Sequence, residues 1–314
     1  MKNFAITGVA GYIAPRHLQA IKDTGNNLIA ALDPHDSVGI LDRYFPNVGF
    51  FVDFERFERY VEMLHRKSIT ERIHYLSICS PNFLHDAHIR LALRTDADAI
   101  CEKPIVLNPW NLDALEELEN ETGKKIYNIL QLREHQAIID LKNKVETEKK
   151  NSKHEIILTY ITSRGSWYDY SWKGVKEKSG GVATNIGVHF FDMLGWIFGK
   201  VQTNKLYLNE PRKVSGFLEF ERANVRWFLS IDKSDLPSEA VNENKTTYRS
   251  LKLDGEEFHF SDGFTELHTK VYQSILNGKG FGVNDARQSI EIVHEIRNAK
   301  VDDKAEYAHP ILGK

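Results

Sequence analysis

Apolar and polar residues follow two alternating patterns along the first part of the chain. Short apolar runs such as FAIT (4–7) and LIAAL (28–32) have the length of buried strands. Residues 15–24 instead place Leu18 and Ile21 on one face beside polar positions, at the spacing of a helix. The same alternation predicts strands at 73–79, at the start of 98–104 and at 125–132, and helices at 54–66, 83–94 and 109–121. Strands that alternate with helices predict βαβ units and a parallel sheet.

The pattern changes after residue 155. Polar and apolar residues alternate in FLEF (217–220), WFLS (227–230) and LKLD (251–254), which predicts an antiparallel sheet with one face in solvent. Strands are expected at 155–162, 205–210, 213–221, 225–232 and 248–255, and helices at 185–198, 264–277 and 284–298.

These patterns predict an α/β protein of two domains. Residues 1–132 are expected to form a Rossmann fold with a parallel sheet. Residues 133–314 are expected to form an α+β domain on a mainly antiparallel open sheet, whose C-terminal segment can pack back on the first domain. The charged stretch 142–153 (KNKVETEKKNSK) is typical of a solvated helix end and loop, with a linker as the alternative.

Composition narrows the class of protein. The 314 residues carry 41 Lys and Arg against 44 Asp and Glu, a formal charge of −3, so no basic field for nucleic acid is expected. No apolar run approaches the roughly 18 residues of a membrane span. The start MKNFAITGVAG lacks the long apolar region of a signal peptide. The cysteines, Cys79 and Cys101, are too few for a disulfide framework, and we expect a cytoplasmic protein.

A glycine-rich motif, GVAGYIA (8–14), follows the first predicted strand and opens the first predicted helix. Small residues there allow a tight turn that brings backbone N–H groups to a pyrophosphate. The alternative is a βα turn that is glycine-rich without binding a cofactor. The motif has alanine where the dinucleotide fingerprint has its second glycine, and the residues expected to bind cofactor are Gly8, Ala10, Gly11, Tyr12 and Ile13.

Polar residues follow the next predicted strands, where an open α/β sheet binds its ligand. Asp33 ends the second strand, and an acid there accepts bonds from a ribose 2′-hydroxyl and repels a 2′-phosphate, which favours NAD over NADP. An exposed strand-end carboxylate is the alternative. Ser80, Asn82 and His85 follow the strand at 73–79 and are expected to face the cofactor, although Asn82 also suits a helix cap.

Two further motifs carry the expected chemistry. Glu102 and Lys103 end a predicted strand, where the Lys103 ammonium can stabilise a developing alkoxide beside the cofactor. Asn185, His189 and Asp192 have helical spacing, so they can share one face. A neutral histidine is a suitable base for an alcohol proton near pH 7, and Asp192 could fix its tautomer. A buried structural histidine is the alternative, and the set lacks a third convincing ligand for a metal site.

Together these residues resemble the glucose–fructose oxidoreductase/inositol dehydrogenase/MocA family. The resemblance rests on GVAGYIA (8–14), SPNFLH (80–85), EKP (102–104) and GGVATNIGVHFFD (180–192), with NDARQSIEI (284–292) similar to the family's C-terminal helix. It covers essentially the whole chain. The family's usual aspartate before Gly-x-His is Asn185 here.

Within the family, SRGSWYDYSWKG (163–174) resembles a segment of the WlbA/WbpB-type enzymes. The resemblance implies NAD-dependent oxidation of the 3-hydroxyl of UDP-N-acetylglucosaminuronic acid for surface-polysaccharide (O-antigen) sugars. Such a substrate carries a carboxylate and a diphosphate, which Arg164 and Lys173 or Lys176 can bind. Flat apolar faces for a sugar or uracil ring are offered by Trp167, Tyr168 and Trp172, with an aromatic surface loop or subunit contact as the alternative.

The implied reaction is hydride transfer to NAD. His189 is expected to take the hydroxyl proton while Lys103 bonds the same oxygen, although the two could divide the proton work differently. The resemblance also implies that 2-oxoglutarate reoxidises the cofactor, and we expect a homodimer or homotetramer. The alternatives are a family dehydrogenase for another sugar or inositol, and a non-catalytic NAD-binding sensor.

Overall fold

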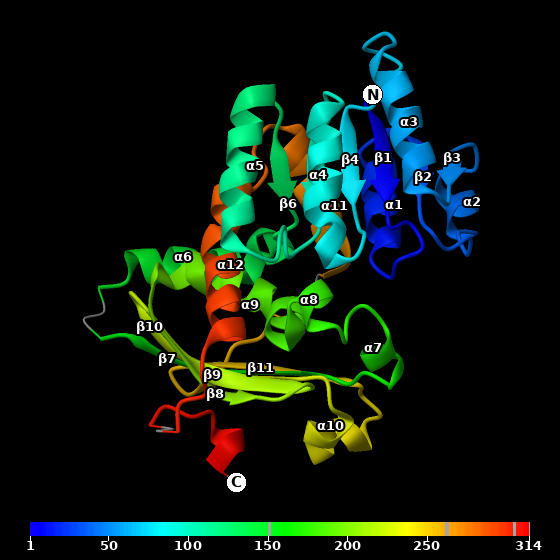
Figure 1. The fold of residues 1–314 in the computed structure, drawn as a ribbon. Coiled ribbons are helices and arrows are strands. Elements are labelled where there is room, and N and C mark those ends of the chain that lie inside the picture. Colours follow the sequence, from blue (N-terminus) through cyan, green and yellow to red (C-terminus); the bar gives the residue numbers. More distant parts are fainter. Residues whose placement is uncertain (150–151, 261–263, 304–305, 314) are drawn as a thin grey trace. The chain divides into compact units, whose positions relative to one another are not determined.

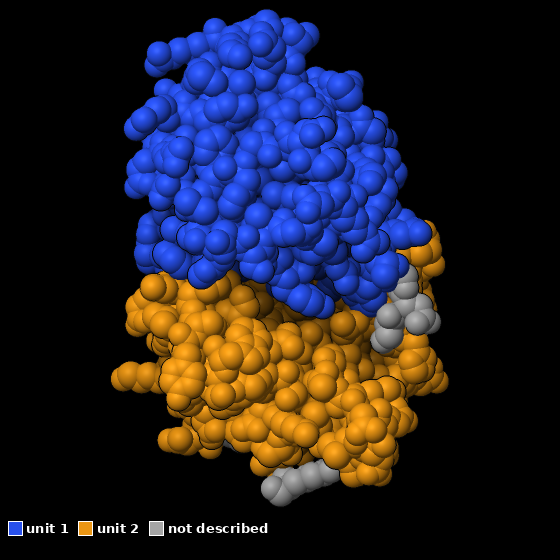
Figure 2. Space-filling view, turned by 90° about the vertical axis from the view of Figure 1, so that its right-hand side faces the viewer, with its two compact units in different colours: residues 1–134, 263–287 blue, residues 135–262, 288–314 orange. Residues whose placement is uncertain are grey.

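The computed structural model describes residues 1–149, 152–260, 264–303 and 306–313. The chain forms two compact units, residues 1–134 with 263–287 and residues 135–262 with 288–314 (Figures 1 and 2). The first boundary lies near the one expected at residue 132. Residues 263–287 group with the first unit, whereas the sequence analysis expected that a C-terminal segment can pack back there without saying which residues it comprises.

The first unit is built on a six-stranded sheet in the order β3-β2-β1-β4-β5-β6, with all its strand pairs parallel. This is the strand order of a Rossmann fold, so the predicted fold class is confirmed. The order reverses between β1 and β4, the place where such sheets bind their ligand. The strands are β1 Asn3–Thr7, β2 Asn27–Leu32, β3 Gly49–Phe51, β4 Tyr75–Ile78, β5 Asp98–Cys101 and β6 Ile126–Asn128.

The helices of this unit pack on the sheet through apolar stripes. Leu18 and Ile21 of α1 share a buried cluster with Phe4 of β1 and with Val271 and Tyr272 of α11. α11 comes from the segment that returns after the second unit's sheet (orange in Figure 1). The helices are α1 Ala14–Asp23, α2 Ile40–Tyr44, α3 Phe54–His65, α4 His85–Arg94, α5 Pro109–Thr122 and α11 Leu267–Leu276, with 3₁₀ turns η1 Asn82–Leu84, η2 Gln131–Glu134 and η5 Phe264–Glu266.

The second unit is also built on a six-stranded sheet, in the order β12-β11-β7-β10-β9-β8. Its strand pairs are antiparallel except β7 with β10, so the expected mainly antiparallel sheet is confirmed. The strands are β7 His154–Thr162, β8 Val201–Asn209, β9 Lys213–Phe220, β10 Ala223–Ser230, β11 Thr247–Leu253 and β12 Glu256–Glu257.

Helix α9 covers one face of this sheet and packs against α6. The Phe191 ring of α9 meets Trp227 of β10 edge-on at 5.2 Å between centroids. The charged stretch 142–153 begins inside α6, which confirms a helix end for residues 142–147. The other elements are α6 Gln136–Thr147, α7 Trp167–Tyr170, α8 Lys176–Ser179, the π-helical turn η3 Ala183–Gly187, α9 Val188–Phe198, η4 Lys233–Asp235, α10 Ser238–Asn242, α12 Val283–Asn298 and η6 Pro310–Gly313.

The prediction of a solvent-exposed sheet face is wrong for WFLS (227–230), because all four residues are buried. The C-terminal residues cover the second face of the sheet. The Tyr307 ring stacks on Phe217 at 4.7 Å, and the His309 ring lies 5.7 Å from that of Phe228. Strand alternation cannot reveal this cover, since the covering residues lie far along the chain.

No described helix is both long enough and apolar enough to cross a membrane.

We expect Phe228→Ala to lower the free energy of unfolding by about 3–5 kcal/mol, because it leaves a cavity beside Ile161 and Leu236. Tyr307→Ala is the matched control. Tyr307 is 41% exposed, and its loss should cost about 1 kcal/mol or less. Urea unfolding followed by tryptophan fluorescence measures both. Equal losses in the two variants would contradict the assignment of Phe228 to a closed core.

Candidate active site

The glycine-rich turn joins β1 to α1 in a conformation that requires glycine. Gly8 has a φ of +77°, and a Cβ there would lie 2.5 Å from backbone atoms of Cys79 and Ser80. The backbone N–H groups of Gly11 and Ala14 bond the carbonyls of Gly8 and Gly11, at 3.0 and 3.1 Å. Helix α1 then begins with Pro15 in its first turn. The structure therefore has the tight turn at a helix N-terminus that suits a pyrophosphate.

Asp33 lies beside this turn, as the sequence predicted. It is 5% exposed, its Oδ2 accepts a bond from the Ala10 backbone N–H at 2.9 Å, and its Oδ1 accepts one from His35 N–H at 2.9 Å. The carboxylate thus fixes the turn to the end of β2. Tyr12, by contrast, is almost fully exposed, and Ile13 is half-buried. The arrangement of turn and acid fits the adenosine half of a bound NAD, which this unit's Gly8, Gly11 and Asp33 would hold.

The predicted residues after β4 form a buried polar cluster. Ser80 Oγ lies 2.9 Å from Nδ1 of His88, which also contacts Thr7 Oγ1 at 3.0 Å. His85 Nδ1 lies 2.7 Å from the Pro104 carbonyl and its Nε2 lies 2.8 Å from the Ser80 carbonyl. Burial lowers the pKa of His85, and the contacts of its two ring nitrogens with carbonyl oxygens oppose that shift. His85 thereby bridges the Ser80 loop and the loop that carries Lys103.

Asn82 opens η1 and is buried. His88 was missed by the sequence analysis, and burial lowers its pKa to about 3. Its only sequence signal is a histidine on the apolar face of a predicted helix, which by itself indicates nothing about a site.

Glu102 and Lys103 follow β5 at the same edge of the sheet. Glu102 Oε1 accepts bonds from Nε2 of His17 and Nε2 of His268, both at 3.0 Å, and Oε2 accepts one from the Lys103 backbone N–H at 3.2 Å. Burial opposes the charge, but the two imidazole bonds hold the pKa of Glu102 well below its usual range. Burial lowers the pKa of Lys103, and the charge of Glu102 opposes that shift.

His17, Glu102 and His268 were not expected to act together. Their donor atoms lie within 4.8 Å of one another, which is also the arrangement of a three-ligand metal site. Sequence reasoning missed His17 and His268 because they lie on helices far apart along the chain, with no shared motif.

In the second unit, Asn185 lies within the π-helical turn η3 and His189 lies in α9, which follows it. The turn η3 ends at Gly187 and α9 begins at Val188, so the helix predicted at 185–198 is irregular at its start. Such turns are frequent at functional sites. His189 is half-buried, with its ring edge-on to Tyr160 at 6.1 Å. Asp192 is buried on the same helix, three residues further on.

Asn185 is held by a residue of the WlbA-like segment. Its Nδ2 donates to the Tyr168 hydroxyl at 2.7 Å. Tyr168 is 2% exposed, so its ring packs against protein in this structure, whereas the neighbouring Trp167 is 54% exposed. Lys173 Nζ lies 3.8 Å from the Trp172 ring centroid, a cation–π contact. The structure thus brings Tyr168 and Asn185 together and leaves Trp167 facing outward.

Arg164 lies on the loop that Arg212 organises. Arg212 donates to the Arg164 carbonyl at 2.6 Å and to both carboxylate oxygens of Asp169 at 2.8 and 2.6 Å. Arg164 is half-buried, and its guanidinium donates a long bond of 3.4 Å to the Ser163 carbonyl. Lys176 Nζ donates to the Arg297 carbonyl at 3.1 Å.

Arg249 of β11 is a second cation that sequence reasoning missed. Its guanidinium lies 5.7, 5.9 and 5.4 Å from the ring centroids of Tyr160, Phe190 and Phe260. The Tyr160 and Phe190 rings also contact His189. A single arginine in the middle of a strand carries no motif, and only the structure shows that it shares aromatic neighbours with His189.

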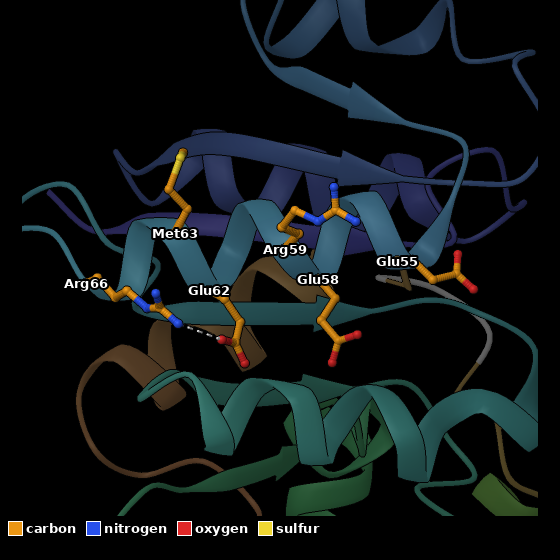
Figure 3. Close-up of a pocket in the computed structure, with 6 residues that line it drawn as sticks. All are labelled: Glu55, Glu58, Arg59, Glu62, Met63 and Arg66. Atoms are coloured by element: carbon orange, nitrogen blue, oxygen red, sulfur yellow. Dashed lines mark ion pairs between the residues drawn. The ribbon is translucent and has the colours of Figure 1, made fainter.

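A surface groove on the first unit is lined by none of these residues. Side chains of α3 line it, and Arg66 and Glu62 form an ion pair across 3.8 Å (Figure 3). Exposed charges on one helix indicate a solvated face, and the groove adds no candidate chemistry.

Family comparisons agree with this architecture. Residues 2–129 match the oxidoreductase family described by its NAD-binding Rossmann fold, and residues 154–234 match that family's C-terminal alpha/beta domain.

Solved structures extend the match to the whole chain. The chain is 48% identical to the WlbA (WbpB) dehydrogenase of Thermus thermophilus in complex with NAD and alpha-ketoglutarate, covering 99% of each chain with a TM-score of 0.94. It is 47% identical to the same enzyme in complex with NAD and UDP-GlcNAcA, with the same coverage and TM-score. The WlbA dehydrogenase of Bordetella pertussis is 17% identical over 95% of this chain and 94% of that chain, with a TM-score of 0.76, and shows the fold alone.

A curated relative, the 2,7-anhydro-N-acetylneuraminate hydratase of Escherichia coli (strain K12), is 24% identical over 213 residues. That alignment covers 64% of this chain and 50% of the hydratase, so the chain spans about half the length of this relative.

We expect Gly8→Ala to abolish NAD binding, because the new Cβ would lie 2.5 Å from the Cys79 and Ser80 backbone. The matched control is Gly25→Ala, since Gly25 has a similar φ of +71° with open space around it. The control should cost about 1 kcal/mol of stability and leave NAD affinity unchanged. Calorimetric titration with NAD and thermal unfolding measure the two effects. If Gly8→Ala bound NAD as tightly as the control, the glycine-rich turn would not be the pyrophosphate site.

Proposed function

The chain belongs to the glucose–fructose oxidoreductase/inositol dehydrogenase/MocA oxidoreductase family, and on that premise we propose that it oxidises the 3-hydroxyl of UDP-N-acetylglucosaminuronic acid. The product is the 3-keto sugar, and the place of the reaction is surface-polysaccharide (O-antigen) sugar biosynthesis. The observation that carries the proposal is the near-full-length match, at 47–48% identity, to a dehydrogenase in complex with NAD and this nucleotide sugar.

The family and the match make the chain an NAD-dependent oxidoreductase. When bound, NAD accepts the hydride that leaves the sugar carbon. The chain's own part is to bind and orient. Gly8, Gly11 and Asp33 suit the adenosine and pyrophosphate end, and Ser80, Asn82, His85 and Glu102 support the edge of the sheet beyond β4 and β5.

Two side chains divide the proton work in this proposal. His189 accepts the proton of the sugar hydroxyl at an imidazole nitrogen, since a neutral ring is a base near pH 7. The Lys103 ammonium stabilises the negative charge that develops on the hydroxyl oxygen. Asn185, in the π-helical turn before α9, orients the substrate. Asp192, on α9 with His189, orients the His189 ring.

The anionic substrate needs cations. Arg164 and Lys173 support binding of the uronate carboxylate or the diphosphate, and Arg249 adds a cation among the aromatic neighbours of His189. Trp167 is exposed and can stack on a sugar or base. Tyr168 acts through Asn185, because its hydroxyl accepts a hydrogen bond from the Asn185 side-chain amide.

The proposal includes a co-substrate, an assembly and a location. We propose 2-oxoglutarate as the oxidant that returns the cofactor to NAD: its keto carbon takes the hydride and its keto oxygen takes a proton, which gives 2-hydroxyglutarate. A related dehydrogenase in complex with alpha-ketoglutarate supports this. We also propose a homodimer or homotetramer in the cytoplasm. The free, buried cysteines Cys79 and Cys101 are consistent with a reducing compartment.

We expect Lys103→Ala and His189→Ala each to lower kcat by about 10²-fold or more while NAD still binds, as is typical when a base or a charge stabiliser is removed. Steady-state kinetics and NAD titration measure the two properties. Rates near wild type in both variants would exclude this mechanism.

Substrate identity is tested by turnover with three compounds: UDP-N-acetylglucosaminuronate, UDP-N-acetylglucosamine and myo-inositol, each with NAD and with or without 2-oxoglutarate. We expect turnover with the uronate and not with the other two compounds. In Arg164→Ala we expect KM for the uronate to rise by about 10-fold or more, because a charged hydrogen bond is lost. Arg94→Ala, at a surface ion pair with Glu58, is the control. Turnover of inositol or of the neutral sugar nucleotide would show that the substrate is a different sugar or polyol. The proposed role of Arg164 in binding the uronate would then be wrong.

A further inference from the structure

In the first unit, a series of buried polar side chains leads by hydrogen bonds to Glu102, the residue before Lys103. Ser77 of β4 lies 2.7 Å from the Tyr272 hydroxyl, which lies 2.7 Å from Nδ1 of His17. His17 Nε2 continues the chain to Glu102, and His268 bonds the same carboxylate oxygen from α11. All five side chains are buried. The elements β4, α1, β5 and α11 therefore meet at one carboxylate.

The hydrogen bonds fix where each proton lies. Glu102 is acceptor-only when ionised, so both imidazoles donate to it through Nε2. A neutral His17 then accepts at Nδ1, so the Tyr272 hydroxyl donates to it and accepts in turn from Ser77. Burial lowers the pKa of His17 and raises that of Tyr272 well above its usual value, which agrees with a neutral ring and a neutral phenol.

His268 is also best satisfied as a neutral ring. Its Nδ1 is buried and has no hydrogen-bond partner among the described residues. A protonated ring would leave a buried N–H without an acceptor there, whereas a neutral ring leaves only a lone pair. The cluster thus holds one net negative charge, on Glu102.

That charge acts on the proposed catalytic ammonium and raises the pKa of Lys103 against the effect of burial. Glu102 Oε2 accepts the backbone N–H of Lys103 itself, so the carboxylate fixes the main chain from which the ammonium extends. The charge of Glu102 also acts on Cys79, Cys101, Tyr272 and His85. Burial raises the pKa of both thiols and of the phenol, so these three are neutral. Burial lowers the pKa of His85, while the contacts of its two ring nitrogens with carbonyl oxygens oppose that shift. Asp86, which acts on Cys101, is paired with Arg90 at 2.7 Å.

We propose that Glu102 is a positioning residue for Lys103, and that His17 and His268 keep it ionised by donating two neutral hydrogen bonds. The cluster holds the backbone at Lys103 and supplies the negative charge that keeps its ammonium protonated. The proposal rests on the catalytic role given to Lys103 above. It assigns a role to His17, His268 and Tyr272, which no motif identified.

The test is the pH dependence of kcat/KM in two variants. Glu102→Gln keeps the shape of the side chain and removes its charge, so Lys103 should lose its proton more easily. The alkaline limb of the kcat/KM profile should then lie lower by about one pH unit or more. His268→Leu removes one donor, so Glu102 should take up a proton more easily, and the acidic limb should gain a second ionisation, below that of His189, at higher pH than in wild type. His268→Gln, which restores an N–H donor, should bring that limb back towards wild type. A uniform fall in rate with both limbs unmoved would overturn the proposal.

The matched control is a second histidine–carboxylate contact, with a buried ring and an exposed carboxylate. His154 Nδ1 lies 2.8 Å from Asp254 Oδ2 in the second unit. His154→Leu should lower stability and leave both limbs in place. If Glu102→Gln does not fold, His268→Leu and His268→Gln decide the question by the same measurement.

A readout without turnover separates this inference from the proposed function. Lysines are reductively methylated with ¹³C and titrated by NMR, with Lys103→Arg used to assign the Lys103 signal. We expect the pKa of Lys103 to fall in Glu102→Gln and to stay unchanged in His154→Leu. If wild type turns over none of the three substrates, the proposed function fails and this titration still decides the inference. An unchanged Lys103 titration in Glu102→Gln would overturn it, as would a stoichiometric divalent metal that is lost in His268→Leu.

Discussion

A carboxylate that is buried in a folded protein needs hydrogen-bond donors around it to offset the loss of water. Glu102 is such a carboxylate in the first unit. Leaving a buried polar group without its hydrogen-bond partners typically costs about 1–3 kcal/mol, and more when the group is charged. The compensation here comes from side chains 255 positions apart along the sequence, His17 and Tyr272, which bond each other, and from His268. The requirement therefore ties α1 to α11 with a directional constraint that apolar packing alone does not supply.

The loops at the carboxyl edge of the sheet follow the same principle. Their conformations are set by buried polar side chains and by one close backbone approach. Asp33 holds the turn at Ala10, His85 bridges two loops, and Gly8 passes against Cys79 where no side chain fits. A rigid edge of this kind can present backbone N–H groups in fixed positions, which lowers the entropic cost of binding a dinucleotide.

Much of the fold was predictable because hydrophobic periodicity directly reports which face of a strand or helix is buried. The motifs around Gly8, Lys103 and His189 were found for a similar reason, since each is local in sequence. What periodicity cannot report is contact between distant segments. It missed the cover of Phe228 by His309, the bond of Asn185 to the buried Tyr168 hydroxyl and the pairing of Glu102 with α11. The strand expected at 125–132 is also shorter, because residues after Asn128 turn into η2.

The first unit is discontinuous in sequence, and this orders events during synthesis. Residues 1–134 leave the ribosome first, but the helix that compensates Glu102 and covers Leu18 and Ile21 lies at 267–276, beyond the sheet of the second unit. Nascent domains usually fold in the order in which they are made. Here the second unit's sheet is complete at Glu257 before α11 has been translated. Until α11 is made, the nascent Rossmann sheet therefore has an uncovered apolar face, and Glu102 lacks one of its two imidazole donors.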